Sequence, residues 1–225
     1  MSAAAPVLNI EGDWLRMPVS AWDHAGFRSW VSSPDFPESV RATFVAREVF
    51  IEMSPEKLES HNKVKTAITV ALGSIVQDED LGELYSDRAL LSNAPAELST
   101  EPDLLFASWA SLESARLRRI PSARGDDFVE LDGTPDLVVE IVSDSSERKD
   151  LKELRAAYAR ANIPEYWIID ARGPGLRFEI LTLSNEGYVA EPSNVSSVFQ
   201  RQFVLERETS RIGSYRYRLR SEQRE

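Results

Sequence analysis

The sequence predicts a fold of the α/β class, in which helices flank a central mixed β-sheet. Short apolar runs typical of buried strands occur at 102–107, 137–142 and 165–170. Two segments, 56–78 and 145–162, have apolar residues spaced by three and four, as in amphipathic helices. Strands and helices follow one another without a repeat or a clear linker, which favours one mixed sheet in a single domain.

The remaining elements are predicted in chain order. Residues 1–17 have no sustained period and are expected to form a mobile arm. Val19 to Trp30 predicts a short helix, and 41–53 predicts a β-hairpin that turns tightly at Ala46–Arg47. Residues 108–134 are polar and are expected to be irregular. A strand or a short hairpin is expected at 84–91, and further short strands are expected at 176–183, 187–190, 199–205 and 215–219.

Length and composition limit the possible functions. The chain has 225 residues, and we expect 18–220 to form a single domain followed by a tail, 221–225. The net charge of -11 argues against nucleic-acid binding through bulk positive charge, although it leaves room for a local basic groove. No signal peptide is recognisable, and no apolar run approaches the roughly 18 residues that a membrane helix needs. We therefore expect a cytoplasmic protein with no membrane contact.

The residue types available restrict the kind of metal site. Cysteine is absent and only two histidines occur, which excludes disulfides, thiolate zinc sites and clusters of several histidines. A metal in this protein would be a hard cation held by carboxylates, such as Mg²⁺ or Mn²⁺.

Two carboxylates stand out because they lie in or beside apolar runs. Glu140 interrupts the run 137–142, and Asp103 begins the run 102–107. A buried, unpaired carboxylate costs several kcal/mol. If the two strands are neighbours, both side chains converge at one end of the sheet, where a divalent cation would offset their repulsion. The alternative is structural: Glu140 pairs with an arginine and Asp103 caps a turn.

Several motifs in order carry a resemblance to a known family. They are EVFIEMSPE, SHNKV, STEPDLLFAS, TPDLVVEIVSDSS and KDLKELRAAYARANIPEYWIID. Together they resemble the Uma-two family of restriction endonucleases, a branch of the PD-(D/E)XK nuclease superfamily. The resemblance runs from about Ala21 to Tyr217 and implies a restriction-endonuclease-like fold, a divalent metal and DNA as the substrate.

The resemblance also implies roles for individual residues. Asp103 and Glu140 would be metal ligands, and Glu48 would be the acidic residue of the N-terminal hairpin that completes the coordination. His61 matches a histidine near the start of the long helix. His61 would either have a catalytic role or contact nucleic acid; the alternative is a structural role as a capping or core-edge histidine.

The lysine of the superfamily is displaced in this sequence. Its simplest position, two residues after the acid, is Val142, and the position that the family commonly uses, four residues before Tyr158, is Leu154. Lys149 and Lys152 are the remaining candidates. On an ideal helix Lys152 lies about 200° from Leu154, so Lys149 is preferred; an ordinary solvated helix start is the alternative for both.

A basic cluster is the first candidate for nucleic-acid contact. It comprises Arg116, Arg118, Arg119 and Arg124, and the Arg-rich C-terminus is a second candidate. Solvated loops and a solvated tail are the alternatives. The predicted function is a metal-dependent endonuclease that hydrolyses DNA phosphodiester bonds, with a homodimer as a plausible means of cutting both strands. A non-catalytic module of the same fold that binds nucleic acid or a protein, and another phosphodiester or nucleotide hydrolase, are the alternatives.

Overall fold

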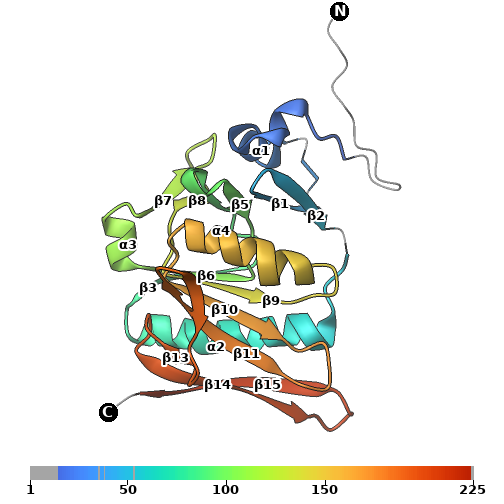
Figure 1. Cartoon of the computed structure of the whole chain (residues 1–225), viewed down its shortest axis with the longest axis vertical. Coiled ribbons are helices and arrows are strands. Elements are labelled where there is room, and N and C mark those ends of the chain that lie inside the picture. Colours follow the sequence, from blue (N-terminus) through green and yellow to red (C-terminus); the bar gives the residue numbers. More distant parts are fainter. Residues whose placement is uncertain (1–14, 35, 38, 53, 224–225) are drawn as a thin grey trace, which may run out of the picture.

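The computed structural model describes residues 15–34, 36–37, 39–52 and 54–223. Two six-stranded sheets, a three-stranded sheet and a few helices form a mixed α/β structure, which confirms the predicted fold class (Figure 1). No helix in these four ranges is long and apolar enough to cross a membrane.

The central sheet is built from the apolar runs that the sequence predicts as strands. In spatial order its strands are β12 (Gly187–Ala190), β11 (Arg177–Ser184), β10 (Glu165–Asp170), β9 (Leu137–Ile141), β6 (Leu104–Ser108) and β3 (Gly82–Ser86). β9 and β10 are parallel, whereas β6 and β9 are antiparallel, so the sheet is mixed. The start of β6 consequently lies next to the end of β9.

Helices cover both faces of the central sheet. One face packs on α2 (Lys63–Asp78), through Val64, Ile68, Leu72 and Val76. The other face packs on α4 (Arg155–Arg160) and on strands of the second sheet. Both helices begin with a π-helical turn, at Leu58–Asn62 and Lys149–Leu154 respectively. The predicted helix over 145–162 is therefore shorter and less regular than expected.

The second sheet contains the predicted N-terminal hairpin. In spatial order its strands are β2 (Glu48–Glu52), β1 (Arg41–Val45), β5 (Leu98–Thr100), β4 (Leu91–Asn93), β8 (Phe128–Gly133) and β7 (Leu117–Pro121). Ala46 and Arg47 both have positive φ, 49° and 67°, as a two-residue type I′ turn requires. The hairpin and its turn are confirmed.

The prediction of irregular structure at 108–134 is wrong. This segment forms α3 (Trp109–Glu113), β7 and β8. β7 is an edge strand whose middle residues, Arg118 and Arg119, are exposed. An edge strand of this kind lacks the apolar run or clean alternation by which buried strands are recognised.

Both ends of the described chain contribute to folded elements. Leu15 and Met17 are buried against α1 (His24–Val31), which follows a 3₁₀ turn at Val19–Trp22; the first 14 residues of the predicted arm lie outside the described ranges. The three-stranded sheet has the order β13 (Val195–Ser196), β14 (Arg201–Thr209) and β15 (Tyr215–Gln223), so part of the predicted tail is strand. The extent of a single domain stays a prediction. A 3₁₀ turn at Ala94–Ala96 completes the elements.

Candidate active site

Asp103 and Glu140 lie at the edge where β6 begins and β9 ends. Leu104 pairs with Val139 across the two antiparallel strands, which places the preceding residue, Asp103, beside Glu140. Asp103 Oδ2 accepts a hydrogen bond of 2.8 Å from the backbone N–H of Ile141. Each carboxylate residue is only 4% exposed. Both line a cavity of about 30 Å³, which is room for about one water molecule.

Asp103 is held by two basic side chains from the start of α2. His61 Nε2 lies 3.3 Å from Asp103 Oδ2, and Lys65 Nζ lies 3.0 Å from Asp103 Oδ1. Burial raises the pKa of Asp103, but the hydrogen bond and charge of His61 and the charge of Lys65 outweigh burial and lower the pKa to about 2. Asp103 is therefore a carboxylate anion at neutral pH.

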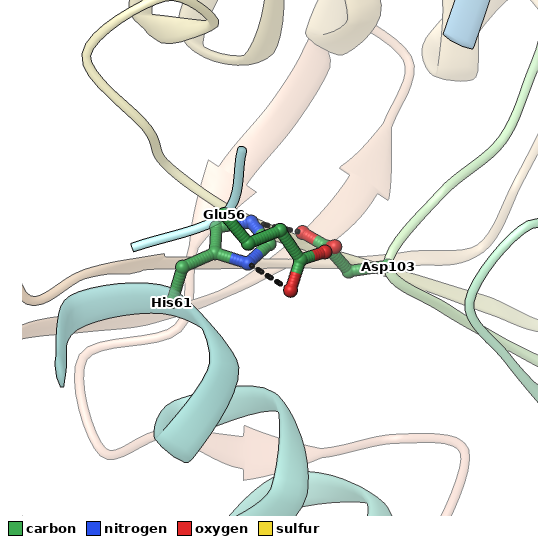
Figure 2. Close-up of side chains that lie close together, drawn as sticks. All are labelled: Glu56, His61 and Asp103. Carbon is green, nitrogen blue, oxygen red and sulfur yellow. Dashed lines mark ion pairs between the residues drawn. The ribbon is translucent and has the colours of Figure 1, made fainter. Parts of the chain in front are cut away.

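His61 lies between two carboxylates (Figure 2). Its Nδ1 is 3.6 Å from Glu56 Oε2 and has no hydrogen-bond partner among the described residues. Burial lowers the pKa of His61, but the hydrogen bond and charge of Asp103 more than offset burial, so the pKa is raised. One ligand atom from each of Glu56, His61 and Asp103 lies within 4.8 Å of the others, and such a group fits a metal site.

Glu140 has different neighbours from Asp103, because its side chain contacts residues on the α4 side of the sheet. The Tyr158 hydroxyl donates a hydrogen bond of 2.6 Å to Glu140 Oε1. Burial raises the pKa of Glu140, and the charges of Asp150 and Asp103 raise it further. Lys149 only partly opposes these effects, so Glu140 tends to keep its proton in the metal-free protein.

Lys149 is the positive group next to this carboxylate. It forms ion pairs with Glu52 of β2 and with Asp150, 3.7 Å away, and only 8% of the residue is exposed. Burial lowers the pKa of Lys149, but the charges of Asp150, Glu140 and Glu52 outweigh burial and raise it. Lys149 is thus a fixed positive charge in the cavity wall.

The cavity contains more negative than positive groups. Five carboxylates line it, against two permanent cations, Arg41 and Lys149, and one histidine; these carboxylates are Glu52, Glu101, Asp103, Glu140 and Asp150. Two of them each have an oxygen, Glu101 Oε2 and Asp150 Oδ1, that is buried without a hydrogen-bond partner among the described residues. Each of these oxygens lies only in a long ion pair, at 3.8 Å from Arg88 Nε and at 3.7 Å from Lys149 Nζ respectively. The excess of carboxylates fits a hard divalent cation.

Two residues that the sequence proposes for this site lie outside the cavity. Glu48 is at the turn end of β2, with its side chain 55% exposed and paired with Arg148. Glu52, four residues further along the same strand, is the hairpin carboxylate that reaches the cavity. Lys152 is 78% exposed and lies 3.8 Å from Glu153. Leu154 and Val142, the positions at which the resemblance in the sequence would place the lysine, are completely buried in the apolar core.

The predicted nucleic-acid cluster is on a different part of the molecule. Arg118 and Arg119 belong to β7, the edge strand on the opposite side of the second sheet from β2. Arg116 forms an ion pair with Asp136, and Arg118 forms one with Asp132. The guanidinium of Arg119 stacks on Phe128 at 4.7 Å. Arg124 lies exposed in the turn between β7 and β8.

Several site residues were not predicted, although the sequence contains weak signals for some of them. Lys65 follows His61 by four residues, so both point to one face of the helix. Glu52 has the same strand parity as Glu48. Glu56 and Asp150 have no comparable signal, because Glu56 lies in an irregular segment before α2 and the position of Asp150 depends on a π-helical turn.

Buried carboxylates and a lysine thus meet at the edge of a mixed sheet with flanking helices. The chain belongs to the Uma2 family, whose model carries the description "Putative restriction endonuclease" and matches residues 27–207. This confirms the predicted family.

A solved structure with some likeness is the "putative nuclease belonging to DUF820" from Anabaena variabilis ATCC 29413. It is 14% identical, with a TM-score of 0.49, and the match covers 76% of this chain and 89% of that chain. No curated protein matches the chain.

Proposed function

We propose that this protein is a metal-dependent endonuclease that hydrolyses phosphodiester bonds in DNA. The observation that carries the proposal is the meeting of Asp103, Glu140 and Lys149 at one buried cavity. Family membership supports nucleic acid as the substrate class. The excess of carboxylates supports Mg²⁺ or Mn²⁺ as the cofactor.

The side chains have separable roles in this proposal. Asp103 and Glu140 would hold the cation, which when bound polarises the phosphodiester and lowers the pKa of a water molecule. The Ile141 N–H orients Asp103, and Tyr158 orients Glu140. Lys149 places a positive charge beside the cavity, where negative charge develops on the phosphate in the transition state. Glu48 and Lys152 have no part in this scheme.

Two further features remain part of the proposal. A homodimer would present two such sites to the two strands of a duplex. A cytoplasmic location would place the protein together with DNA. Sedimentation of the protein alone and with duplex DNA tests the first of these.

The central test is cleavage of supercoiled plasmid with Mg²⁺ or Mn²⁺. We expect nicked or linear product from the wild type, and at least a 100-fold loss of rate in Asp103→Asn and in Glu140→Gln. Glu48→Gln is the matched control, because it neutralises an exposed acid on the same hairpin, and it should retain the wild-type rate. No cleavage by the folded wild type with either metal would contradict the proposal.

One observation favours a second function, a non-catalytic module of the same fold. Leu154 puts an apolar, fully buried side chain where the family commonly has its lysine, and Lys65 and His61 already neutralise Asp103. Such a module would bind nucleic acid or a protein equally well with and without a chelator. Binding that requires Mn²⁺ would exclude it.

A further inference from the structure

A second hollow lies on the side of α2 that faces away from the central sheet. It has a volume of about 920 Å³ and runs between this side of the helix and the edge strand β15. Thr66, Val70 and Ser74 line it from the helix, and the turn at 210–214 closes one end. We call this hollow the α2–β15 groove. Its size is that of a ligand-binding cleft.

The charge on the α2–β15 groove is opposite to that of the whole chain. Four basic residues line it, namely Lys63, Arg211, Arg216 and Arg218, and among the described residues no acidic residue does. The three arginines form no ion pair with any described residue, whereas the chain as a whole has a net charge of -11. Lys63 pairs with Glu59, so the unpaired charges of the strip are those of the three arginines; such a strip on an acidic protein attracts a polyanion.

The floor of the groove is apolar and aromatic. Val70 and Ile212 are 64% and 89% exposed, and Tyr215 is 37% exposed although the Arg207 guanidinium lies 4.4 Å from its ring. The ring of Tyr217 follows at a centroid distance of 6.5 Å. Exposed apolar side chains beside a basic strip indicate a ligand that is apolar on one side and anionic on the other.

The groove is joined to the active-site end of α2. Lys63 Nζ donates hydrogen bonds to Ser214 Oγ and to the carbonyl oxygen of Tyr215, at 3.2 and 3.1 Å. Glu59 accepts a hydrogen bond of 2.8 Å from the Tyr215 N–H. His61, which contacts Asp103, belongs to the same turn of the chain as Glu59.

We propose that the α2–β15 groove binds a single-stranded segment of nucleic acid. Tyr215 and the apolar floor would stack on bases, and Lys63, Arg211, Arg216 and Arg218 would contact phosphates. This is the combination that proteins use for single strands, whereas a duplex hides its bases from such a floor. An acidic peptide would use the basic strip but has less use for the exposed tyrosine. The choice of nucleic acid rests on the proposed function.

The test is binding of fluorescein-labelled dT12 and of a duplex of equal length, measured by anisotropy in EDTA so that no cleavage occurs. We expect the wild type to prefer dT12. Arg216→Gln/Arg218→Gln should weaken binding at least 10-fold at low salt, and should make the slope of log K against log salt shallower by about 1.4. Tyr215→Leu should weaken binding roughly 5- to 150-fold while leaving that slope unchanged.

A matched control removes the same charge from another surface. Arg119→Gln/Arg124→Gln alters the β7–β8 hairpin and should bind dT12 like the wild type. The proposal that the groove binds single strands is excluded if Arg216→Gln/Arg218→Gln binds dT12 normally, or if both double variants lose affinity for dT12 equally. The proposal is also excluded if the protein binds polyglutamate but not dT12.

The groove and the proposed activity can fail separately. If the wild type cleaves plasmid and the groove variants bind dT12 normally, the proposed nuclease activity stands and the proposed role of the groove is excluded. If the wild type cleaves no plasmid but binds dT12, and the groove variants lose this binding, the proposed role of the groove stands and the proposed nuclease activity is excluded.

Discussion

The lysine of this site comes from a position that the family pattern does not specify. Leu154 and Val142 fill the core at the two usual positions, and Lys149 enters the cavity from the start of the π-helical turn instead. Its ammonium pairs with Glu52 of the N-terminal hairpin. A lysine has a long flexible side chain, so the charge can reach one place from different positions of the backbone.

Replacing Lys149 should therefore affect catalysis, and replacing Lys152 should not. Lys149→Met should reduce the rate of plasmid cleavage about 100- to 1,000-fold at saturating Mn²⁺, because a preorganised positive charge is lost beside the phosphate. Lys152→Met changes a lysine three residues away that is 78% exposed, and serves as the control. Equal rates for the two variants would contradict the assignment of Lys149.

Asp150 makes the stability of the metal-free protein depend on pH. Burial raises its pKa, and although Lys149 and Ser146 oppose this, the pKa reaches about 7 from an ordinary 3.8. Between these values the folded protein holds a proton that the unfolded chain has released, so stability falls as pH rises from about 4 to 7. The effect amounts to about 4 kcal/mol at most.

Asp150→Asn should remove this dependence. In EDTA we expect the variant to gain thermal stability relative to the wild type at pH 8 but not at pH 4, measured by circular dichroism. Glu113→Gln, which changes an exposed acid on α3, should follow the wild type at both pH values. If the difference in Tm between Asp150→Asn and the wild type is the same at pH 4 and at pH 8, Asp150 is not the source of the pH dependence.

At the level of elements, two of the segments that deliver basic groups to the site contain π-helical turns. Leu58–Asn62 carries His61, and Lys149–Leu154 carries Lys149 and Asp150. A π-helical turn changes the direction in which the following side chains point, and such turns occur often at functional sites. The two turns explain why a helical wheel with 3.6 residues per turn does not predict the directions of the His61, Lys149 and Asp150 side chains.

Another buried carboxylate joins β10 to the C-terminal part of the chain. Glu165 is completely buried, and its oxygens accept hydrogen bonds from Trp167 Nε1, Ser196 Oγ, Ser197 Oγ and the N–H groups of Ser197 and Val198. Its role is structural, because every one of these donors would lose its partner without it.

Glu165→Ala should destabilise the fold by about 3 kcal/mol, since two buried donors, Trp167 Nε1 and Ser196 Oγ, are left unsatisfied. Urea denaturation followed by tryptophan fluorescence measures the loss. Glu179→Ala on the neighbouring strand β11 is the control, because it removes only a partly exposed pair with Arg177, and it should change stability by less than about 1 kcal/mol. A change equally small in Glu165→Ala would contradict this role.

Across the whole molecule, charge is distributed unevenly. Acidic residues are in excess in the cavity between β6 and β9, and basic residues are in excess in the α2–β15 groove. The net charge of -11 therefore agrees in sign with the cavity but does not describe the α2–β15 groove. The raised pKa values of Glu140 and Asp150 lower the stability of the metal-free protein at neutral pH, and a bound divalent cation would relieve this cost.

Divalent metal should accordingly stabilise the whole protein. At Mn²⁺ concentrations about 100 times the dissociation constant, we expect about 2.7 kcal/mol of stabilisation, or roughly 5–10 °C in Tm. Asp103→Asn/Glu140→Gln should show no such increase, although it retains the fold. An equal increase in Tm for this double variant would place the metal elsewhere.

The sequence alone predicts the parts that depend on local pattern. Apolar runs predict the central strands, spacing by three and four predicts α2, and two carboxylates in apolar surroundings indicate Asp103 and Glu140. The exposed edge strand β7 and the π-helical turns escape such patterns, because their residues are arranged by contacts with distant parts of the chain. Only the tertiary structure joins Glu52 and Lys65 to the carboxylates, and it separates Glu48, Lys152 and the Arg116–Arg124 cluster from them. The physical reason is that burial and charge pairing between distant segments, rather than sequence spacing, determine which ionisable groups share a cavity.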